Sequence, residues 1–417
     1  MDKKNLFAVL MAFWVLFPAL SVYPQDRDKL RSEVVSAIKE ASDYACSVLL
    51  DKKGESRCDY NMIQGKWYPY EPAWHTGQLI NALLEAYGIT KDKRYLRTAE
   101  RAGGWWCSLR IKDNPKLDGM IRAIHGDGIN YINFSTISDG TPGLFALTKA
   151  TGNKEYAETA TVAGKWMLEH MYVPGKGVFY DVVDPQTGKV LKENSPFWRN
   201  KQKQTLYDVA RPNNEGSLYR DMYEFTKNGK YKEVFINICN SLIDKQDANG
   251  LWMDFTPNNK EKGTFHPRFN LWYAESLING YDLAGNKKYL DAAVKTLKTY
   301  QKTQQKDGTI YYINYLDGKY DNNSLAGSAT AFAGLLWIRL VERGVGDEFK
   351  ENIEKSAQWI LKNRFAVTHP DKNLAGAIID TWSKRKDGTI WLVQRDLGTS
   401  FGIRFLVDYY NYKFGKK

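Results

Sequence analysis

The stretch RPNNEGSLYRDMYEFTKNGKYKEV, residues 211 to 234, decides the fold because it contains two helices and the turn between them. Tyr219 and Met222 belong to a series of apolar residues at the three- and four-residue spacing of an amphipathic helix. A Lys-Asn-Gly-Lys turn then ends this helix, and Tyr231 begins the next one. The segment therefore predicts a helical hairpin whose first helix starts at a polar mouth, Arg211 to Glu215.

The same hairpin pattern returns along the chain. Its other copies are GITKDKRYLRTAE (88–100), KATGNKEYAETA (149–160), DLAGNKKYLDAA (282–293) and, more weakly, ERGVGDEFKENIEK (342–355). Repeats of this length indicate one supersecondary unit used several times. We predict six inner helices, which start near Trp74, Thr141, Asn214, Phe269, Gly327 and Gly398. Charged amphipathic helices after each turn are their outer partners, and residues 27–50 supply one more.

The last predicted inner helix ends the chain, so its outer partner has to be the helix at the start. This pairing closes a ring, and the fold class is therefore all-α: an (α/α)6 toroid, or six-hairpin barrel. Small residues at Gly77, Gly143, Gly216 and Gly327 permit close packing of the inner helices. An open helical solenoid is the alternative. It needs polar capping repeats at its ends, and the final FGIRFLVDYYNY is too apolar for that role.

A second kind of signal lies between the hairpin copies. PGKGVFYDV (174–182), DANGLWMDF (247–255), KDGTIYYINY (306–315) and KDGTIWLVQRD (386–396) each combine a glycine turn with alternating aromatic and polar residues. This pattern predicts short β-hairpins or extended loops. Because they separate the helical hairpins, we expect them at the opposite end of the ring from the short turns, together with residues 54–72 and 113–139.

The start of the chain predicts export. Lys3 and Lys4 precede an apolar run from Leu6 to Leu20, the layout of a secretory signal peptide. We expect residues 1–24 to be this peptide, 25–417 to be a single domain, and the protein to be periplasmic or secreted, monomeric, and not inserted in a membrane after cleavage. In such a compartment Cys46 and Cys58 can pair, and buried thiols are the equal alternative.

Composition narrows the range of partners. The net charge is +11 and 14% of the residues are aromatic. The lysines are scattered along the chain, which argues against a nucleic-acid partner. In an exported protein, many Trp and Tyr residues instead suggest stacking on sugars, and the basic balance suggests an acidic oligo- or polysaccharide. No phosphate loop, nucleophile elbow or zinc-ligand spacing occurs, so we expect no cofactor and no metal.

The predicted ring places the long loops and the inner-helix N-termini on one face, where helix dipoles favour anions. Asp139 is the first candidate catalytic carboxylate, and helix capping before Thr141-Pro142 is an equal alternative. Glu215 is the second, as acid or base, unless it only complements a helix dipole. The candidate substrate-binding residues are Trp74, His75, His125, Asp127, Arg211, Asn213, Asn214, His266, Arg268 and Trp272.

These candidates have different expected roles. Arg211 and Arg268 can pair with a substrate carboxylate, with surface arginine as the alternative. Trp272 lies one helical turn beyond Arg268 and would stack on a sugar or pack in the core. A zinc site made from the three histidines and Asp127 is conceivable, but no ligand spacing supports it.

Two segments carry a family resemblance. SDGTPGLFALTKATGNKEYA (138–157) and HPRFNLWYAESLINGYDLAGNKKYL (266–290) resemble inner-helix segments of six-hairpin glycosidases, above all the unsaturated glucuronyl and rhamnogalacturonyl hydrolases and secreted bacterial glucuronidases. The resemblance implies an essential Asp at the second inner helix, which matches Asp139, and an Arg and a Trp on the fourth, which match Arg268 and Trp272. It also implies an Asp at the third helix, where this chain has Glu215 instead. The hydration of unsaturated sugars is therefore in doubt.

The resemblance implies a glycoside hydrolase that removes a terminal uronic acid, expected to be glucuronic, from an acidic glycan by two-carboxylate catalysis. A polysaccharide lyase or uronyl epimerase with a Tyr or His base is the second hypothesis, because His75, His266 and Asn213-Asn214 can supply its groups. A non-catalytic glycan-binding toroid is the third.

Overall fold

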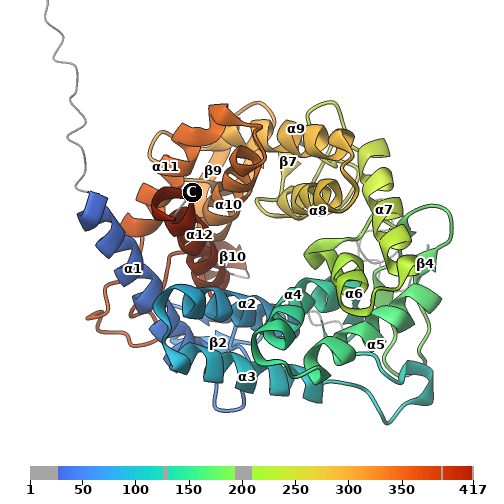
Figure 1. Ribbon diagram of the computed structural model, residues 1–417. Helices are drawn as coiled ribbons and strands as arrows, with labels where there is room; N and C mark the ends of the chain where they lie inside the picture. Colours follow the sequence, from blue (N-terminus) through green and yellow to red (C-terminus); the bar gives the residue numbers. More distant parts are fainter. Residues whose placement is uncertain (1–26, 125–129, 193–208, 387, 416–417) are drawn as a thin grey trace, which may run out of the picture.

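The computed structural model describes residues 27–124, 130–192, 209–386 and 388–415. In these residues twelve α-helices form two concentric rings, the predicted (α/α)6 toroid (Figure 1). The inner helices are α2 (Pro72–Thr90), α4 (Phe134–Thr151), α6 (Leu218–Thr226), α8 (Phe269–Ala284), α10 (Gly327–Glu342) and α12 (Leu397–Phe414). The outer helices are α1 (Arg27–Tyr44), α3 (Lys93–Ser108), α5 (Glu155–His170), α7 (Gly229–Asp244), α9 (Lys287–Thr303) and α11 (Lys350–Lys362).

The outer helices begin at the repeated turn because an Asn or Asp caps them. The side chain of Asp92 accepts the backbone N–H of Arg94, and Asn228 and Asn286 accept the equivalent N–H two residues ahead. Such a cap satisfies one of the N–H groups that a helix start leaves free. The repeated motif is therefore a helix-start signal, which is why the sequence predicts these starts to within two residues.

The ring is closed by the two ends of the described chain. Helix α12 contacts α1, α2 and α10, and the Arg31 guanidinium donates to the Tyr410 hydroxyl at 2.8 Å. A chain whose last helix packs on its first is a closed toroid and not an open solenoid. The π-helical turn η1 (Ala45–Leu49) extends α1 almost to the predicted end.

Glycines set the distance between neighbouring inner helices. A Cβ on Gly77 would lie 2.0 Å from the carbonyl oxygen of Gly140 in α4, and one on Gly143 would lie 2.3 Å from that of Gly77. A Cβ on Gly327 would lie 1.8 Å from the carbonyl oxygen of Ile379. Each of these backbones therefore lies closer to its neighbour than any residue other than glycine allows.

Helix α4 starts seven residues earlier than the sequence predicts. Pro142 lies inside it, not in its first turn, and Asp139 does not cap it. A proline in a helix removes one N–H donor and frees the carbonyl four residues back. Here that carbonyl belongs to Ser138, and the Thr141 hydroxyl donates to it at 2.7 Å. The capping interpretation of Asp139 is therefore wrong.

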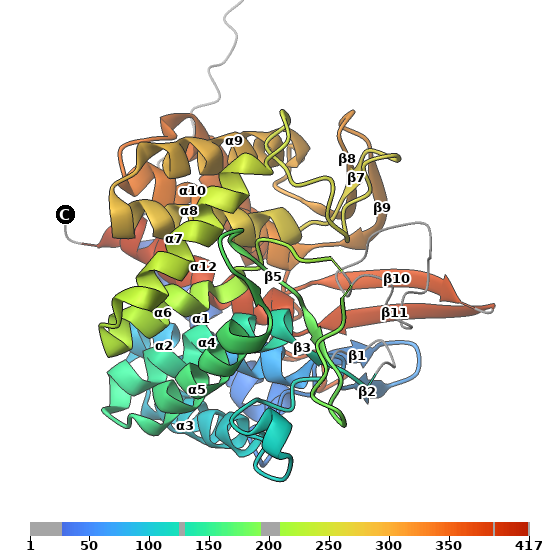
Figure 2. The ribbon, with the colours of Figure 1, turned by 90° about the vertical axis from the view of Figure 1, so that its right-hand side faces the viewer.

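The strands lie at the end of the ring away from the short turns (Figure 2). One sheet has the order β10-β11-β1-β2, another β7-β8-β9, and the pairs β3-β6 and β4-β5 complete the set. Their bounds are β1 (Asp59–Asn61), β2 (Lys66–Tyr68), β3 (Ile132–Asn133), β4 (Tyr172–Val173), β5 (Val178–Phe179), β6 (Val182–Val183), β7 (Thr264–Phe265), β8 (Tyr311–Tyr315), β9 (Tyr320–Leu325), β10 (Thr381–Lys386) and β11 (Thr389–Arg395).

The structure also tests one of the predicted loops and the predicted cysteine pair. Residues 247–255, expected to be a hairpin or an extended loop, contain no strand. They form turns, one of which is closed by the Asp247 N–H donating to the Leu251 carbonyl. Cys46 and Cys58 are both free thiols. The expected signal peptide, and also His125 and Asp127, lie outside the described residues. Within the described ranges, no helix is both long enough and apolar enough to span a bilayer.

Candidate functional site

The polar residues predicted from the sequence converge at the strand end of the inner ring. Those in the described part of the chain that are buried are His75, Asp139, Arg211, Asn213, Asn214, Glu215, Arg268 and Trp272; Trp74 and His266 are partly buried. The residues expected at the polar mouths of the inner helices therefore form a buried polar centre.

Asp139 and Glu215 are neighbours because a glycine lets two backbones touch. Glu215 begins the 3₁₀ turn η3 (Glu215–Ser217), which precedes α6. Its second residue, Gly216, has a φ of +74°, and a Cβ there would lie 2.2 Å from the Ser138 carbonyl oxygen and 3.0 Å from the Asp139 Cα. Only glycine meets both demands, so Gly216 holds Glu215 beside Asp139.

The two carboxyl groups differ from ordinary ones. Burial raises the pKa of Asp139 well above its usual range, and the charge of Glu215 raises it further. Burial also raises the pKa of Glu215, against the opposing effect of Arg211. Two close carboxyl groups resist double ionisation, so the pair favours one protonated and one ionised member.

Two side chains fix the Asp139 carboxyl. The indole N–H of Trp272, on α8, donates to Oδ1, and the Gln78 amide on α2 donates to the Asp139 carbonyl at 2.6 Å and to Oδ1 at 3.4 Å. The Trp272 ring meets Trp74 at 5.7 Å and Phe332 at 5.2 Å. Trp272 therefore packs among aromatic rings and orients Asp139.

Glu215 is held by a buried ion-pair cluster. The Arg211 guanidinium donates to Glu215 Oε1 at 3.0 Å and to the Tyr273 hydroxyl at 2.6 Å. Asp181 lies 3.7 Å from the same guanidinium and accepts the Asn213 amide at 2.5 Å. Arg211 is 1% exposed, so the surface interpretation of this residue is wrong.

Several buried polar atoms at this centre have no hydrogen-bond partner among the described residues. They are Glu215 Oε2, Arg211 Nε and Nη2, Trp74 Nε1, His75 Nε2, Asn213 Oδ1, and both amide atoms of Asn133 and Asn214. Buried polar groups in folded proteins are nearly always paired. A cluster of unpaired ones is therefore a place where a polar ligand or water would bind.

His75 forms a second polar group near the start of α2. Its Nδ1 lies 2.5 Å from Asp396 Oδ1, and Ser56 donates to Asp396 Oδ2 at 2.5 Å. Burial alone would lower the pKa of His75, but Asp396 raises it well above the usual range. Cys58 lies beside this pair, with a backbone φ of +63°.

Cys58, His75 and Asp396 are also the one group of described residues whose arrangement approaches that of a metal site. Two ligands of a tetrahedral zinc ion, at roughly 2.0–2.2 Å from it, lie about 3.3 Å apart. The contact of 2.5 Å between His75 and Asp396 is shorter than this separation. As arranged, these atoms form a hydrogen bond and are not spaced as ligands.

His266 and Arg268 lie at the mouth of α8. The Nδ1 atom of His266 accepts the backbone N–H of Arg268 at 3.2 Å and of Phe269 at 3.1 Å. Burial and the charges of Arg268 and Arg395 hold the pKa of His266 well below its usual range. His266 is therefore a neutral helix cap. This role also leaves Nδ1 unavailable to a metal.

Arg268 retains unused binding capacity. Its Nη1 donates to Ser328 at 2.8 Å and lies 3.8 Å from Asp380. Its Nε has no partner among the described residues, and its guanidinium lies 5.7 Å from the centre of the Tyr312 ring. Arg395 adds a second buried guanidinium, paired with Asp59 at 3.2 Å.

Sequence reasoning missed Asp181, Tyr273, Gln78 and Cys58. Asp181 lies between the short strands β5 and β6, within the predicted hairpin at residues 174–182. That position was the only signal in the sequence that it faces the site. Gln78 and Tyr273 lie inside helices and Cys58 directly precedes β1, and nothing in the local sequence distinguishes them from core residues.

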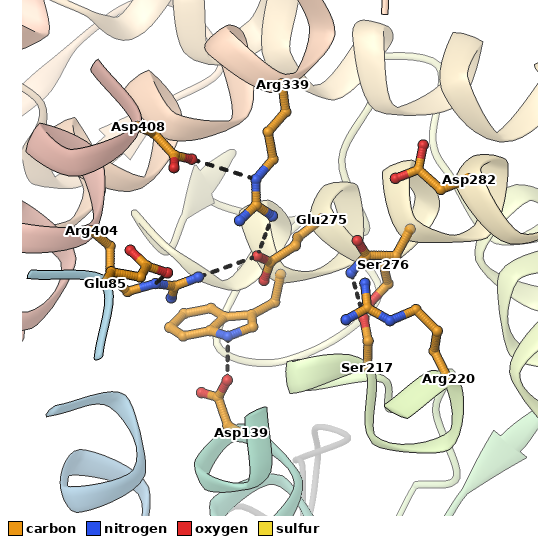
Figure 3. Close-up of polar contacts among 12 residues, drawn as sticks. Glu85, Asp139, Ser217, Arg220, Glu275, Ser276, Asp282, Arg339, Arg404 and Asp408 are labelled. Atoms are coloured by element: carbon orange, nitrogen blue, oxygen red, sulfur yellow. Dashed lines mark hydrogen bonds and ion pairs between the residues drawn. The ribbon is translucent and has the colours of Figure 1, made fainter. Parts of the chain in front are cut away.

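A network of charges lies near Asp139 in the ring interior, above Asp139 in the view of Figure 3. Arg404 donates to Gln78 Oε1 at 3.0 Å and lies 3.6 Å from both Glu85 and Glu275. Arg339 donates to Glu275 at 2.8 Å and lies 3.8 Å from Asp408. We call Glu85, Glu275, Arg339, Arg404 and Asp408 the floor network.

No family model and no curated protein sequence matches the chain. Solved structures do. Cellobiose 2-epimerase from Bacillus thermoamylovorans B4167 is 14% identical, with a TM-score of 0.70 over 92% of this chain and 98% of that one. Unsaturated glucuronyl hydrolase from Bacillus sp. GL1 is 12% identical, with a TM-score of 0.65 over 94% and 100%. D-mannose isomerase is 14% identical, with a TM-score of 0.62 over 93% and 100%. The chain thus has the six-hairpin toroid fold that these carbohydrate-active enzymes share.

Proposed function

We propose that the protein is a secreted glycoside hydrolase that removes a terminal uronic acid from an acidic glycan. The observation that carries the proposal is the pair Asp139 and Glu215, two buried neighbouring carboxyl groups with raised pKa values among unpaired polar atoms. Glycoside hydrolysis needs one carboxyl group as acid and a second as base or nucleophile. The glucuronyl hydrolase among the similar structures makes a uronide substrate a reasonable choice.

We assign the two catalytic roles from the surroundings of each carboxyl group. Asp139 has no described cation in hydrogen-bond contact, and it is the group whose pKa is raised well above its usual range. It is therefore the protonated acid that donates to the glycosidic oxygen. Glu215 has Arg211 on Oε1 and an unpaired Oε2. It is therefore the ionised carboxylate, with one oxygen free to accept a proton from the attacking water.

Arg268 is our choice for the uronate carboxylate. Arg211 is held by Glu215 at 3.0 Å, whereas Arg268 has its nearest carboxylate oxygen at 3.8 Å and an unpaired Nε. A guanidinium with free N–H groups recognises a carboxylate strongly. The neighbouring Trp74, partly buried with an unpaired Nε1, would contact the sugar ring.

The test is a screen of oligosaccharides that end in a saturated or an unsaturated uronic acid, with the products weighed by mass spectrometry. The proposal expects release of a single uronic acid, with the two products together heavier than the substrate by one water. Internal cleavage, or products with unchanged mass, would contradict it.

One observation favours a second candidate, a lyase or epimerase with a histidine base. His75 has a carboxylate on Nδ1 and an unpaired Nε2, the arrangement of an oriented proton acceptor, and epimerases and isomerases are among the similar structures. Its raised pKa argues against a neutral base at pH 7. Elimination gives an unsaturated uronate that absorbs in the near ultraviolet, epimerisation leaves the mass unchanged, and hydrolysis adds one water, so the absorbance and mass of the products together decide among them.

A further inference from the structure

Strands β10 and β11 form the longest hairpin, and they project away from the helices at the strand end of the ring (Figure 2). In their register Lys384 pairs with Trp391 and Trp382 pairs with Val393. Directly paired residues share a face, and alternate residues on one strand share it too. Trp382, Lys384 and Trp391 therefore lie on one face of the hairpin, which we call the Trp391 face.

Aromatic rings and positive charges adjoin on the Trp391 face. The Lys384 ammonium is 5.6 Å from the centre of the Trp382 ring, and the Trp391 ring is 4.9 Å from that of Tyr68 on β2, at an interplanar angle of 53°. Lys384 is exposed and both tryptophans are partly so. The two tryptophan rings do not belong to the described hydrophobic core. The part of their aromatic surface that is exposed to solvent is therefore available to a ligand.

The same face leads to the candidate site. Trp391, Val393 and Arg395 are alternate residues of β11 and so point to one side. Arg395 is buried, pairs with Asp59, and lies close enough to His266 to lower its pKa together with Arg268. Arg395 is followed directly by Asp396, which contacts His75 at 2.5 Å, so the strand that carries the Trp391 face ends at the candidate site.

We infer that the Trp391 face binds the part of an acidic polysaccharide that extends beyond the terminal residue. The flat apolar faces of pyranose rings fit indole rings, and carboxylate or sulfate groups of the glycan pair with Lys384. This inference rests on the proposed function for its occupant. Continuity with the site favours a glycan over a nucleic acid, which would also suit aromatic and basic side chains.

The test uses the full chain and polymers immobilised for affinity electrophoresis: heparin and polygalacturonate as acidic glycans, dextran as a neutral glycan, and single-stranded DNA. We expect Lys384→Ala and Trp391→Ala each to weaken binding to at least one of the two acidic glycans by about tenfold, because each removes an exposed charge or aromatic contact. Lys384→Glu, an exposed change that leaves the fold intact, weakens it further. The control is Arg385→Ala, on the opposite face of the same strand, where Arg385 pairs with Ile390; it should change binding less than twofold.

The outcomes separate this inference from the hydrolase proposal, because binding needs no turnover. Equal losses in the Lys384 and Arg385 variants, or binding to dextran as tight as to both acidic glycans, would overturn the inference. Tighter retention on DNA than on either glycan would assign the face to nucleic acid and overturn it as well. Face-specific binding by a protein that releases no uronic acid would leave the surface in place and remove the hydrolase.

Discussion

Two buried polar clusters lie within the same ring, and they differ in how completely their atoms are paired. In the floor network each guanidinium faces at least two carboxylates: Arg339 faces Glu275 and Asp408, and Arg404 faces Glu85 and Glu275. Only two buried atoms of the floor network, Glu85 Oε2 and Arg404 Nε, have no hydrogen-bond partner among the described residues, whereas at least ten buried side-chain atoms of the candidate site, which we call the site cluster, have none. Paired buried charges are a structural solution, whereas unpaired ones cost stability unless a ligand satisfies them. The comparison predicts that changes in the site cluster affect turnover and changes in the floor network affect stability.

Asp139→Asn should have the largest effect. We expect turnover on the active substrate to fall by about 10³–10⁴-fold, because an amide cannot donate the proton that a positioned acid supplies. Stability should not fall, because the Asn oxygen still accepts the Trp272 indole N–H and the folded protein already holds Asp139 neutral. Single-turnover kinetics and thermal melting measure the two quantities.

The raised pKa of Asp139 also predicts how the stability of the Asp139→Asn variant should change with pH. A carboxyl group with a raised pKa in the folded state lowers stability as pH rises through the interval between its unfolded and folded pKa values. Replacing Asp139 by Asn removes this penalty, so the variant should melt at an equal temperature at pH 4 and at a higher one at pH 8. A variant that melts lower at pH 8 would contradict the protonated assignment.

Glu215→Gln should be the second largest effect. We expect turnover to fall at least about 100-fold, because the base is lost. The free energy of unfolding should change by less than about 2 kcal/mol, because the substitution removes the carboxylate desolvation that raises the pKa of Glu215 while it leaves the buried Arg211 with Asp181 at 3.7 Å as its nearest carboxylate. Near-normal turnover in this variant beside an inactive Asp139→Asn would exclude the two-carboxylate mechanism and favour His75 as base.

The sequence predicted the helical hairpins well for a local reason. The outer helices α3, α7 and α9 begin at an Asp or Asn cap and have one apolar face, so these signals lie within about ten residues. It misplaced the start of α4 because Pro142 usually marks a first turn, and the Thr141 hydroxyl that tolerates the proline has no separate signature. Helix α6 begins at Leu218, four residues after the predicted Asn214, because the 3₁₀ turn η3 precedes it, and the other four inner helices begin within two residues of their predicted starts.

The site was predictable in part. Asp139, Glu215, His75 and Arg268 were found because they lie at inner-helix mouths, and the ring brings all mouths to one end. The contacts among them were not predicted, because Asp181 meets Asn213, Trp272 meets Asp139 and Asp396 meets His75 across 32, 133 and 321 positions of the chain. Such contacts exist only once the ring closes, and no local pattern encodes them.

Arg339→Met should affect stability alone. It removes the closest partner of Glu275, and both side chains are mostly buried, so the free energy of unfolding should fall by about 2 kcal/mol. Turnover should stay within about threefold, because Arg339 contacts no member of the site cluster among the described residues. Arg343→Met is the matched control: it breaks the pair with Asp282, which is 42% exposed, and should cost about 1 kcal/mol or less. Equal losses in urea unfolding would contradict the buried-network interpretation.

Glu85→Gln should have the smallest effect, with a sign that depends on pH. Burial raises the pKa of Glu85 to about 7, against the opposing charge of Arg404. Because the folded pKa exceeds the unfolded one, folded Glu85 binds a proton more tightly, and stability falls as pH rises from about 4.5 to about 7. Gln has no such proton to lose. The variant should therefore match the parent or fall slightly below it at pH 4.5, and exceed it by about 1 kcal/mol at pH 8, in urea unfolding at each pH.

The control for Glu85 is Glu354→Gln, an outer-helix glutamate that pairs with Lys413 at 2.7 Å, with side chains 36% and 39% exposed. The substitution removes the pair with Lys413 and relieves no buried charge, so this variant should gain nothing at pH 8. If Glu85→Gln instead loses stability at pH 8, the attraction between Glu85 and Arg404 outweighs the desolvation of the carboxylate. Each charge of the floor network would then contribute to stability. The floor network and the site cluster would differ more in their contribution to stability than the raised pKa of Glu85 implies.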